Sequence, residues 1–354
     1  MSLGRYKSKN FFIVWLYIMC FMVILAIFVG GLTRLTKSGL SITEWLPISG
    51  VIPPLIESDW MLAFNKYKLS PEYKYANFTM DLGGFKKIFW LEFIHRIIGR
   101  LIFIMYIIPG LFFAFCHYIT SRNIFYYCIV GMLILLQGYI GWYMVKSGLV
   151  NNPSVSHYRL ALHLFVSLVI YIMLFWQLMR SSFDMFLVSE FVYANQLAVV
   201  SRYLSIAIII VFLQIIIGAF VAGLDAGLVY NTYPCMGGDV IASELFHLKL
   251  DMNILNNPVL VQCLHRLFAI FILLYNVFLA IVLIRTGYTK LIKLSIVLLF
   301  AVAIQFVLGV LTLIYYVPII LALLHQIGAV ILISYLVYGL FLVKSNQFEE
   351  LFYH

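Results

Sequence analysis

Long apolar stretches alternate with short polar segments along nearly the whole chain. The first stretch runs from Phe11 to Gly30, and its roughly 20 residues are enough to cross the hydrocarbon core of a bilayer. This length favours a retained span over a shorter, cleaved signal peptide. Seven further stretches of the same character lie at about 92–116, 124–145, 159–179, 203–223, 258–284, 291–315 and 319–343. The pattern predicts an all-α integral membrane protein with eight transmembrane helices.

Composition indicates that membrane lipid surrounds most of these helices. The chain is 64% hydrophobic and 10% charged, whereas soluble domains are about a quarter charged. The net charge of +9 is not gathered into a basic stripe with interleaved aromatics, so we expect no nucleic-acid partner. The five cysteines form no C-x-x-C or C-x-x-C-H motif, which argues against iron–sulfur, zinc-ribbon and covalent c-type haem sites.

The first four spans and the last four resemble two copies of one unit. The strongest match is His95-Arg96 in the second span with His265-Arg266 in the sixth. The other matched positions are Gly30 with Gly218, Gln137-x-x-x-Gly141 with Gln305-x-x-x-Gly309, and Leu162-His163 with Leu324-His325. A repeat with an even number of spans gives both copies the same orientation. We predict two tandem four-helix bundles, residues 1–190 and 191–354.

Basic residues in the short loops predict the orientation, because cytoplasmic loops are enriched in Lys and Arg. The N-terminal tail contains Arg5, Lys7 and Lys9, and Lys344 follows the last span. We therefore expect both termini in the cytoplasm. The second, fourth, sixth and eighth spans then begin at the outer surface, and each has a histidine within about two turns of its expected start.

These four histidines, His95, His163, His265 and His325, are the main candidates for chemistry. Ionisable groups inside a membrane are costly and are by default functional. Two facing helices that each supply one imidazole at equal depth can hold a haem iron. The pattern predicts one haem between the first pair and another between the second. The alternative is four buried histidines bonded to backbone or hydroxyl groups, since a zinc site would need more ligands in one place.

Three arginines are candidates to pair with haem propionates. Arg96 and Arg266 directly follow their histidines, and Arg159 lies four residues before His163, on the same helix face. Guanidinium groups pair with carboxylates through two parallel hydrogen bonds. The alternative is that these side chains extend to lipid headgroups.

The two halves differ at one position beside the first histidine of each pair. Glu92 lies three residues before His95, whereas the matching residue before His265 is Gln262, which cannot act as a base. This asymmetry predicts chemistry in the N-terminal half and an electron-transfer or structural haem in the C-terminal half. The alternative is that Glu92 only forms an ion pair with Arg96.

The loop at residues 33–90 is long and contains several tryptophans, tyrosines and prolines. Such a composition is typical of a segment at the membrane interface. It is compatible with a lid that controls access to the first bundle and with a packed cap.

Five motifs resemble those of the haem A synthase family, and the likeness extends from Phe11 to about Lys344. They are GGLTRLTKSGLSITEW at 30–45, EFIHR at 92–96, LALHL at 160–164, QCLHR at 262–266 and LALLHQ at 321–326. The first loop has no cysteine, unlike many bacterial members, so the chain resembles the subtype shared by proteobacteria and mitochondria. Without a presequence, we expect it in a bacterial inner membrane, with its haem sites toward the periplasm.

The resemblance implies an enzyme that oxidises the C8 methyl of haem O to a formyl group, giving haem A for cytochrome oxidase. It implies that haem O lies between His95 and His163, that haem B lies between His265 and His325 as an electron relay, and that Glu92 acts at the methyl group. It also implies haem O synthase and an electron acceptor as partners, and self-association.

Two other functions are compatible with the pattern. One is a bis-histidine b-type cytochrome that passes electrons to or from quinone, although such proteins often place two histidines on one helix. The other is a transporter, because internal repeats and polar groups inside the membrane are common there. The asymmetry between Glu92 and Gln262 favours an enzyme over both.

Overall fold

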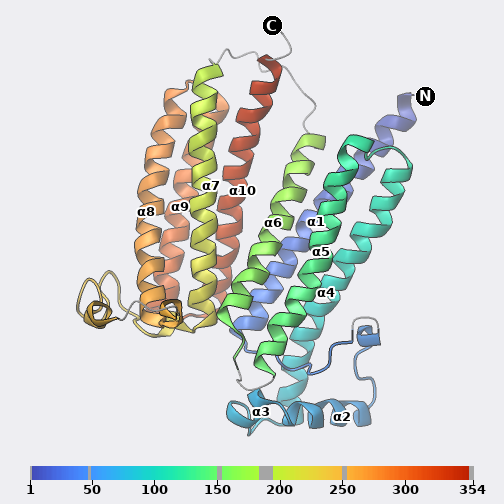
Figure 1. The fold of residues 1–354 in the computed structure, drawn as a ribbon, viewed down its shortest axis with the longest axis vertical. Helices are drawn as coiled ribbons and strands as arrows, with labels where there is room; N and C mark the ends of the chain where they lie inside the picture. The colour runs from blue at the N-terminus through green and yellow to red at the C-terminus, as the bar shows by residue number, and fades with distance from the viewer. Residues whose placement is uncertain (1, 47–48, 150–153, 183–193, 249–252, 351–354) are drawn as a thin grey trace. The chain divides into compact units, whose positions relative to one another are not determined.

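The computed structural model describes residues 2–46, 49–149, 154–182, 194–248 and 253–350, and their regular elements are helical (Figure 1). The α-helices are α1 (Ser2–Leu35), α2 (Glu57–Lys68), α3 (Pro71–Tyr75), α4 (Leu82–Phe115), α5 (Ser121–Gly148), α6 (His157–Ser182), α7 (Ala194–Gly223), α8 (Pro258–Arg285), α9 (Thr289–Ile314) and α10 (Ile319–Glu350). Short 3₁₀ segments are η1 (Ser49–Val51), η2 (Ala226–Leu228), η3 (Ser243–His247) and η4 (Ile254–Asn256).

Eight helices of the described chain are long and apolar enough to cross a membrane, which confirms the predicted all-α fold with eight spans. The spans are Asn10–Leu35, Leu82–Phe115, Asn123–Gly148, His157–Ser182, Gln196–Gly223, Pro258–Arg285, Thr289–Ile314 and Ile319–Ser345. Helices satisfy their backbone hydrogen bonds internally, so they can lie in lipid where no water is available.

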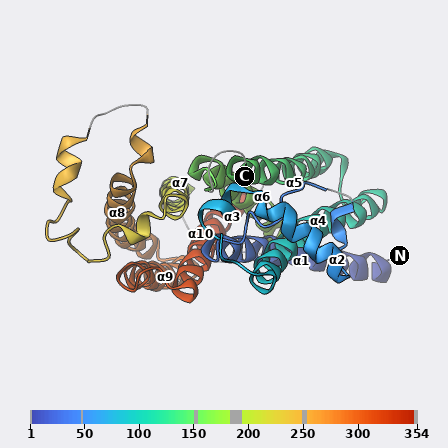
Figure 2. The same ribbon diagram turned by 90° about the horizontal axis from the view of Figure 1, so that it is seen from below.

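The chain divides into two compact units, residues 1–174 and 175–354. The boundary that we expect between residues 190 and 191 falls outside the described part of the chain and stays a prediction. In the second unit α7 contacts α8 and α10, and α9 contacts the same two helices, so the four form a closed bundle. Figure 2 shows these four helices nearly end-on. Fully buried aliphatic side chains line its interior, including Leu204, Leu279, Leu291 and Leu336.

In the first unit α1 and α5 both contact α4, and α2 lies against α4 as well. Helix α4 begins at Leu82, ten residues earlier than the expected start at 92. Asp81 caps this end, because its carboxylate accepts a hydrogen bond of 2.7 Å from the Gly84 amide. His95 therefore lies more than three turns inside α4, so the prediction that it is within two turns of the helix start is wrong.

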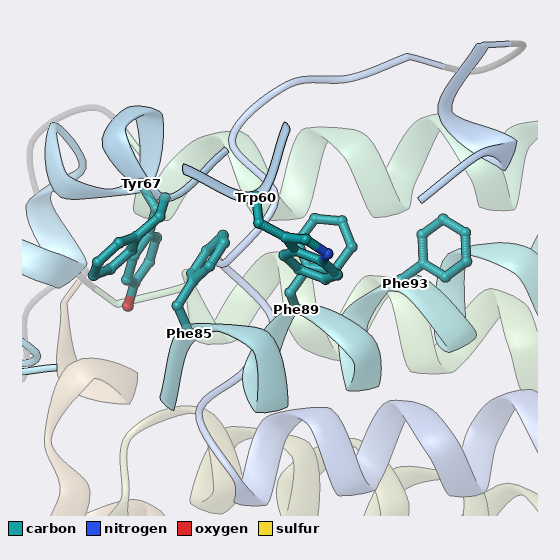
Figure 3. Packing of buried hydrophobic residues seen from close by; sticks show 6 residues of the cluster. Trp60, Tyr67, Phe85, Phe89 and Phe93 are labelled. Carbon is teal, nitrogen blue, oxygen red and sulfur yellow. The ribbon is translucent and has the colours of Figure 1, made fainter. Parts of the chain in front are cut away.

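An aromatic cluster joins α2 to the added first turns of α4. Trp60, Phe64 and Tyr67 on α2 interleave with Phe85, Phe89 and Phe93 on α4 (Figure 3). Ring centroids are 5.0 Å apart for Trp60 and Phe89, and 5.2 Å apart for Phe64 and Phe85. Tyr67 and Phe85 are fully buried. Residues 49–80, called here the α2–α3 cap, thus share a packed core with α4, which favours the packed cap over a mobile lid.

Replacing Phe85 with alanine is expected to loosen the cap. The substitution removes a fully buried ring and leaves a cavity, at a cost of about 3–5 kcal/mol. Limited proteolysis should then cleave the α2–α3 cap faster, while the membrane-embedded helices stay protected. The matched control is Phe78→Ala, which removes a 66% exposed ring from the same region. Equal cleavage rates for the two variants would contradict the packed core.

The cap also contains a buried polar group of three side chains. The Tyr67 hydroxyl donates to Glu72 Oε2 over 3.1 Å, and Asn77 Nδ2 donates to the Tyr67 oxygen over 2.7 Å. Burial is the main cause that raises the pKa of Glu72 to about 7, the Tyr67 hydrogen bond opposes that rise, and the charge of Glu92 adds to it. Glu72 is therefore a carboxyl group that changes charge near neutral pH.

Stability of the cap is expected to depend on pH through Glu72. Between pH 4.5, its ordinary pKa, and about 7, the folded protein binds a proton here that the unfolded chain releases. The free energy of unfolding therefore falls as pH rises through this window, by at most about 3 kcal/mol, and levels off above it. Thermal unfolding of wild type and Glu72→Gln at pH 5 and pH 8 checks this, because the variant should have the flatter profile. Parallel profiles would contradict it.

Candidate functional site

The four histidines lie on four spanning helices, two in each unit: His95 on α4, His163 on α6, His265 on α8 and His325 on α10. The His265 and His325 ring centroids are 6.4 Å apart and the ring planes are at 75°. In a site where two histidines bind one metal, the ring centroids are separated by two metal–nitrogen bonds of about 2 Å and by the distance from each nitrogen to its ring centre. Together these give a centroid separation of roughly 6 Å. The His265–His325 pair therefore has the separation that two axial ligands need. The same placement of His95 and His163 stays a prediction.

Each imidazole lies against a glycine of the spanning helix that precedes its own. A Cβ atom added at Gly30 would lie 3.0 Å from His95 Cε1, and one added at Gly141 would lie 3.0 Å from His163 Cε1. The corresponding distances in the second unit are 3.1 Å from Gly218 to His265 and 2.9 Å from Gly309 to His325. Real Cβ contacts are rarely this short, so any larger residue at these glycines would displace the ring.

Glutamine amides on three of the same preceding helices hold the backbone of the histidines. Gln137 Nε2 donates to the His163 carbonyl over 2.9 Å. Gln214 donates to the His265 carbonyl over 2.9 Å, and Gln305 donates to the His325 carbonyl over 2.7 Å. Each glutamine lies four residues before the glycine that receives the ring. The fourth helix has Ala26 at that position, before Gly30.

Three of the four imidazoles lack the hydrogen bond at Nδ1 that a structural histidine would normally make. The Nδ1 atoms of His95, His163 and His265 are buried without a hydrogen-bond partner. This is unfavourable for a purely structural histidine, because buried polar groups are normally paired. Within the described residues, no three His, Cys, Asp or Glu side chains gather as a metal cluster. The His265–His325 ring separation is compatible with a bis-histidine haem, and haem binding at either pair stays a prediction.

Glu92 is fully buried and accepts four hydrogen bonds. Its Oε2 accepts from Ser41 Oγ over 2.7 Å and from the Ile42 amide over 2.8 Å. Its Oε1 accepts from Arg96 Nε over 3.1 Å and from Nη2 over 2.7 Å. The ion pair with Arg96, which the spacing allowed as an alternative, is thus present, and the carboxylate also fixes the segment after α1. A catalytic role for Glu92 stays a prediction.

The second unit makes the equivalent contacts with a neutral side chain. Gln262 Nε2 donates to the carbonyls of Ala226 and Tyr230, over 2.8 Å and 3.0 Å. Arg266 donates to the carbonyls of Tyr230, Thr232 and Cys235. Both Glu92 and Gln262 therefore anchor the segment that follows the first helix of their unit. The carboxylate is the chemical difference between the two sites.

The predicted propionate-binding arginines make contacts to the protein. Arg96 donates to the carbonyls of Ile42 and Glu44, over 2.9 Å and 3.0 Å. Arg159 donates to the Tyr143 carbonyl over 2.7 Å, and its guanidinium lies 3.6 Å from the centre of the Tyr143 ring. These contacts argue against side chains that extend into lipid headgroups. Propionate binding by Arg96, Arg159 and Arg266 stays a prediction.

Sequence comparison connects this arrangement to a known family. Residues 13–337 match the model of the family described as cytochrome oxidase assembly protein, COX15-CtaA. The chain belongs to this family. It is 45% identical over 333 residues to a heme A synthase of Rickettsia canadensis, covering 94% of this chain and 98% of that protein. It is 43% identical to a heme A synthase of Rickettsia felis over 339 residues, covering 96% of this chain and 100% of the relative.

The region that matches the COX15-CtaA family model includes the candidate site. The matched region contains all four histidines and Glu92, and it includes most of each of the eight spans. A third relative, a heme A synthase of Rickettsia akari, is 42% identical and covers 96% of this chain. The eight apolar helices together with this family show a multi-pass membrane protein.

Proposed function

We propose that this chain is a haem A synthase, which converts the C8 methyl group of haem O to a formyl group. The observation that supports this most is that Glu92, a buried carboxylate, lies one helical turn before His95, whereas Gln262 has the equivalent position before His265. The heme A synthases of Rickettsia, which match almost the whole chain, support the same reaction.

The N-terminal unit is the proposed substrate site. His95 and His163 bind the iron of haem O and hold the macrocycle in a fixed orientation. Oxidation of a methyl to a formyl group removes four electrons and four protons in two successive steps. Each step adds one oxygen atom, for which water is the proposed source, and the resulting gem-diol then loses one water. An electron acceptor is therefore a required partner. Glu92 takes up a proton at the reacting carbon or from water, and one of its four hydrogen bonds must open to admit it.

The C-terminal unit is the proposed site of haem B. When bound, this haem would supply one-electron transfer. His265 and His325 would be its axial ligands, since their rings face each other at 6.4 Å. Gln262 occupies the position of Glu92 and cannot accept a proton as a carboxylate does, which supports a haem that only transfers electrons.

The proposed location is a bacterial inner membrane, with both termini in the cytoplasm and the haem sites toward the periplasm. Basic residues at the N-terminus and after the last span support that orientation. Haem O synthase would supply the substrate and cytochrome oxidase would use the product, so contact with haem O synthase and self-association are further proposals.

Expression in cells that make haem O but lack haem A tests the reaction. Membranes containing this chain should acquire haem A, identified by its mass after extraction and chromatography. Membranes containing His163→Ala should not, because the proposed substrate site has lost one axial ligand. Haem A absent from both, with haem B bound to the purified protein, would instead indicate the electron-transferring b-type cytochrome.

A further inference from the structure

We propose that a Gln-x-x-x-Gly pair on the preceding spanning helix positions three of the four axial histidines. For the fourth, His95, alanine replaces the glutamine, so the pair is Ala26 and Gly30. The bond between His95 and the haem iron is therefore the one that opens when substrate haem enters and product haem leaves. This inference rests on the proposed function, because it takes the four histidines as haem ligands. It assigns positioning roles to Gln137, Gly141, Gln214, Gly218, Gln305 and Gly309, and a kinetic role to Ala26.

The glycines determine where the rings can lie. All four imidazoles present the Cε1 edge to a glycine, at 2.9–3.1 Å from the position of an added Cβ. The same contact occurs at two different helix pairs within each unit and is present in both copies of the repeat. A methyl group there would push the ring by a few tenths of an ångström. Functional side chains must be held within about 0.5 Å of their productive positions, so a shift of a few tenths of an ångström takes up much of this tolerance and is expected to perturb axial coordination.

The glutamines fix the backbone from which each ring projects. Gln137 holds the His163 carbonyl and also donates to Ser167 Oγ, which itself donates to the same carbonyl over 2.7 Å. Gln305 holds the His325 carbonyl, and its own backbone oxygen lies 3.1 Å from His325 Nδ1. Because these amides bond to the backbone carbonyl, the effect of removing one is expected to be that of a single hydrogen bond, about two- to tenfold.

Ala26 is the exception to the Gln-x-x-x-Gly spacing, and it lies in the unit proposed to bind the substrate haem. Its methyl group cannot reach the His95 carbonyl, so His95 is positioned by Gly30 but lacks the amide contact made by the other three helices. A substrate haem must enter and its product must leave, and both steps require an axial bond to open. A resident haem has no such requirement, and both of its ligands have the complete pair. The weaker positioning of His95 therefore agrees with a haem that must be exchanged, and the complete pairs at His265 and His325 agree with a haem that stays bound.

Alanine substitutions on α5 test the glycine contact with a matched control. Gly141 faces His163, whereas Gly138, three residues earlier on the same helix, has nothing within 4 Å of an added Cβ. Gly141→Ala should alter the low-spin bis-imidazole spectrum of the haem O or haem A in the purified protein, and Gly138→Ala should leave it unchanged. Haem B content in the same sample reports folding. Wild-type spectra for Gly141→Ala would overturn the glycine role.

Haem transfer to excess apomyoglobin tests the role of Ala26. Haem O and haem A report the N-terminal site and haem B reports the C-terminal site, so mass spectrometry of the transferred haems separates the two release rates. Ala26→Gln should slow release from the N-terminal site by about two- to tenfold, the effect of one hydrogen bond. Ala26→Leu, similar in size but without an amide, should not slow it. Gln137→Ala should speed it.

The outcomes separate this inference from the proposed function. If the wild-type protein contains no haem at either site, both the proposed function and the positioning role are wrong. Two bound haems with equal release rates in Ala26→Gln and Ala26→Leu, or an unchanged rate in Gln137→Ala, would overturn the positioning role alone. The Gln137→Ala measurement also decides the question if Ala26→Gln does not fold.

Discussion

Replacing His265 with alanine is expected to remove haem B from the C-terminal bundle. The bound haem should fall from about two per chain to about one, because a bis-histidine site loses its iron geometry with either ligand. The low-spin absorption of haem B should disappear, while haem O or haem A remains in the N-terminal site. Difference spectra and extracted haem masses measure both sites in one sample.

The control is His247→Ala, which changes an exposed histidine in the same unit, within η3. It should retain both haems. If His265→Ala also retains full haem B, the ring pair at 6.4 Å is a packing contact and the C-terminal site is assigned wrongly. If His265→Ala does not fold and loses both haems, His265→Met is the second variant to test. Methionine is also an axial ligand in haem proteins.

Replacing Glu92 with glutamine is expected to block conversion of haem O. General acid–base groups contribute about 10²–10⁴-fold, so haem O or a hydroxylated intermediate should accumulate. The amide keeps the shape of the side chain but loses the negative charge and one acceptor oxygen. Iron coordination should persist, because His95 and His163 are unchanged. Haem extraction and mass measurement after co-expression with haem O synthase give the ratio of product to substrate.

The Ser41→Ala variant distinguishes a catalytic role of Glu92 from a structural role in holding the segment after α1. It removes one of the hydrogen bonds that connect Glu92 to the segment after α1, but it leaves the carboxylate in place. If Glu92 acts at the methyl group, Ser41→Ala should still form haem A. If both variants block conversion equally, the carboxylate acts by fixing that segment and the catalytic assignment is wrong.

The eight spans were predictable because apolar stretches of about 20 residues are long enough to dominate local structure. The start of α4 was not. Residues 82–91 include Lys86 and Lys87 and have no uninterrupted apolar character. They are helical because Phe85 and Phe89 pack into the aromatic cluster with α2, a contact with residues some 25 positions earlier in the chain.

The part of the candidate site that could be predicted is the part that lies at matched positions of the two repeat copies. The histidines and Glu92 were found from matched motifs, and the spacing of Glu92 and Arg96 indicated their ion pair. The contacts of Glu92 to Ser41 and Ile42 are tertiary and join segments about 50 residues apart, so no local pattern contains them. The Gln214–Gly218 pair was missed, although its spacing equals that of Gln137–Gly141 and Gln305–Gly309. Searching the sequence for every copy of that spacing would have found it.

The haem content of the purified wild-type protein, expressed with haem O synthase, distinguishes a haem A synthase from an electron-transferring cytochrome. The haems would be extracted, separated by chromatography and identified by mass. A haem A synthase should contain haem B together with haem O or haem A, in about equal amounts. Haem B alone, at about two per chain, would contradict it and show an electron-transferring cytochrome in place of a haem A synthase.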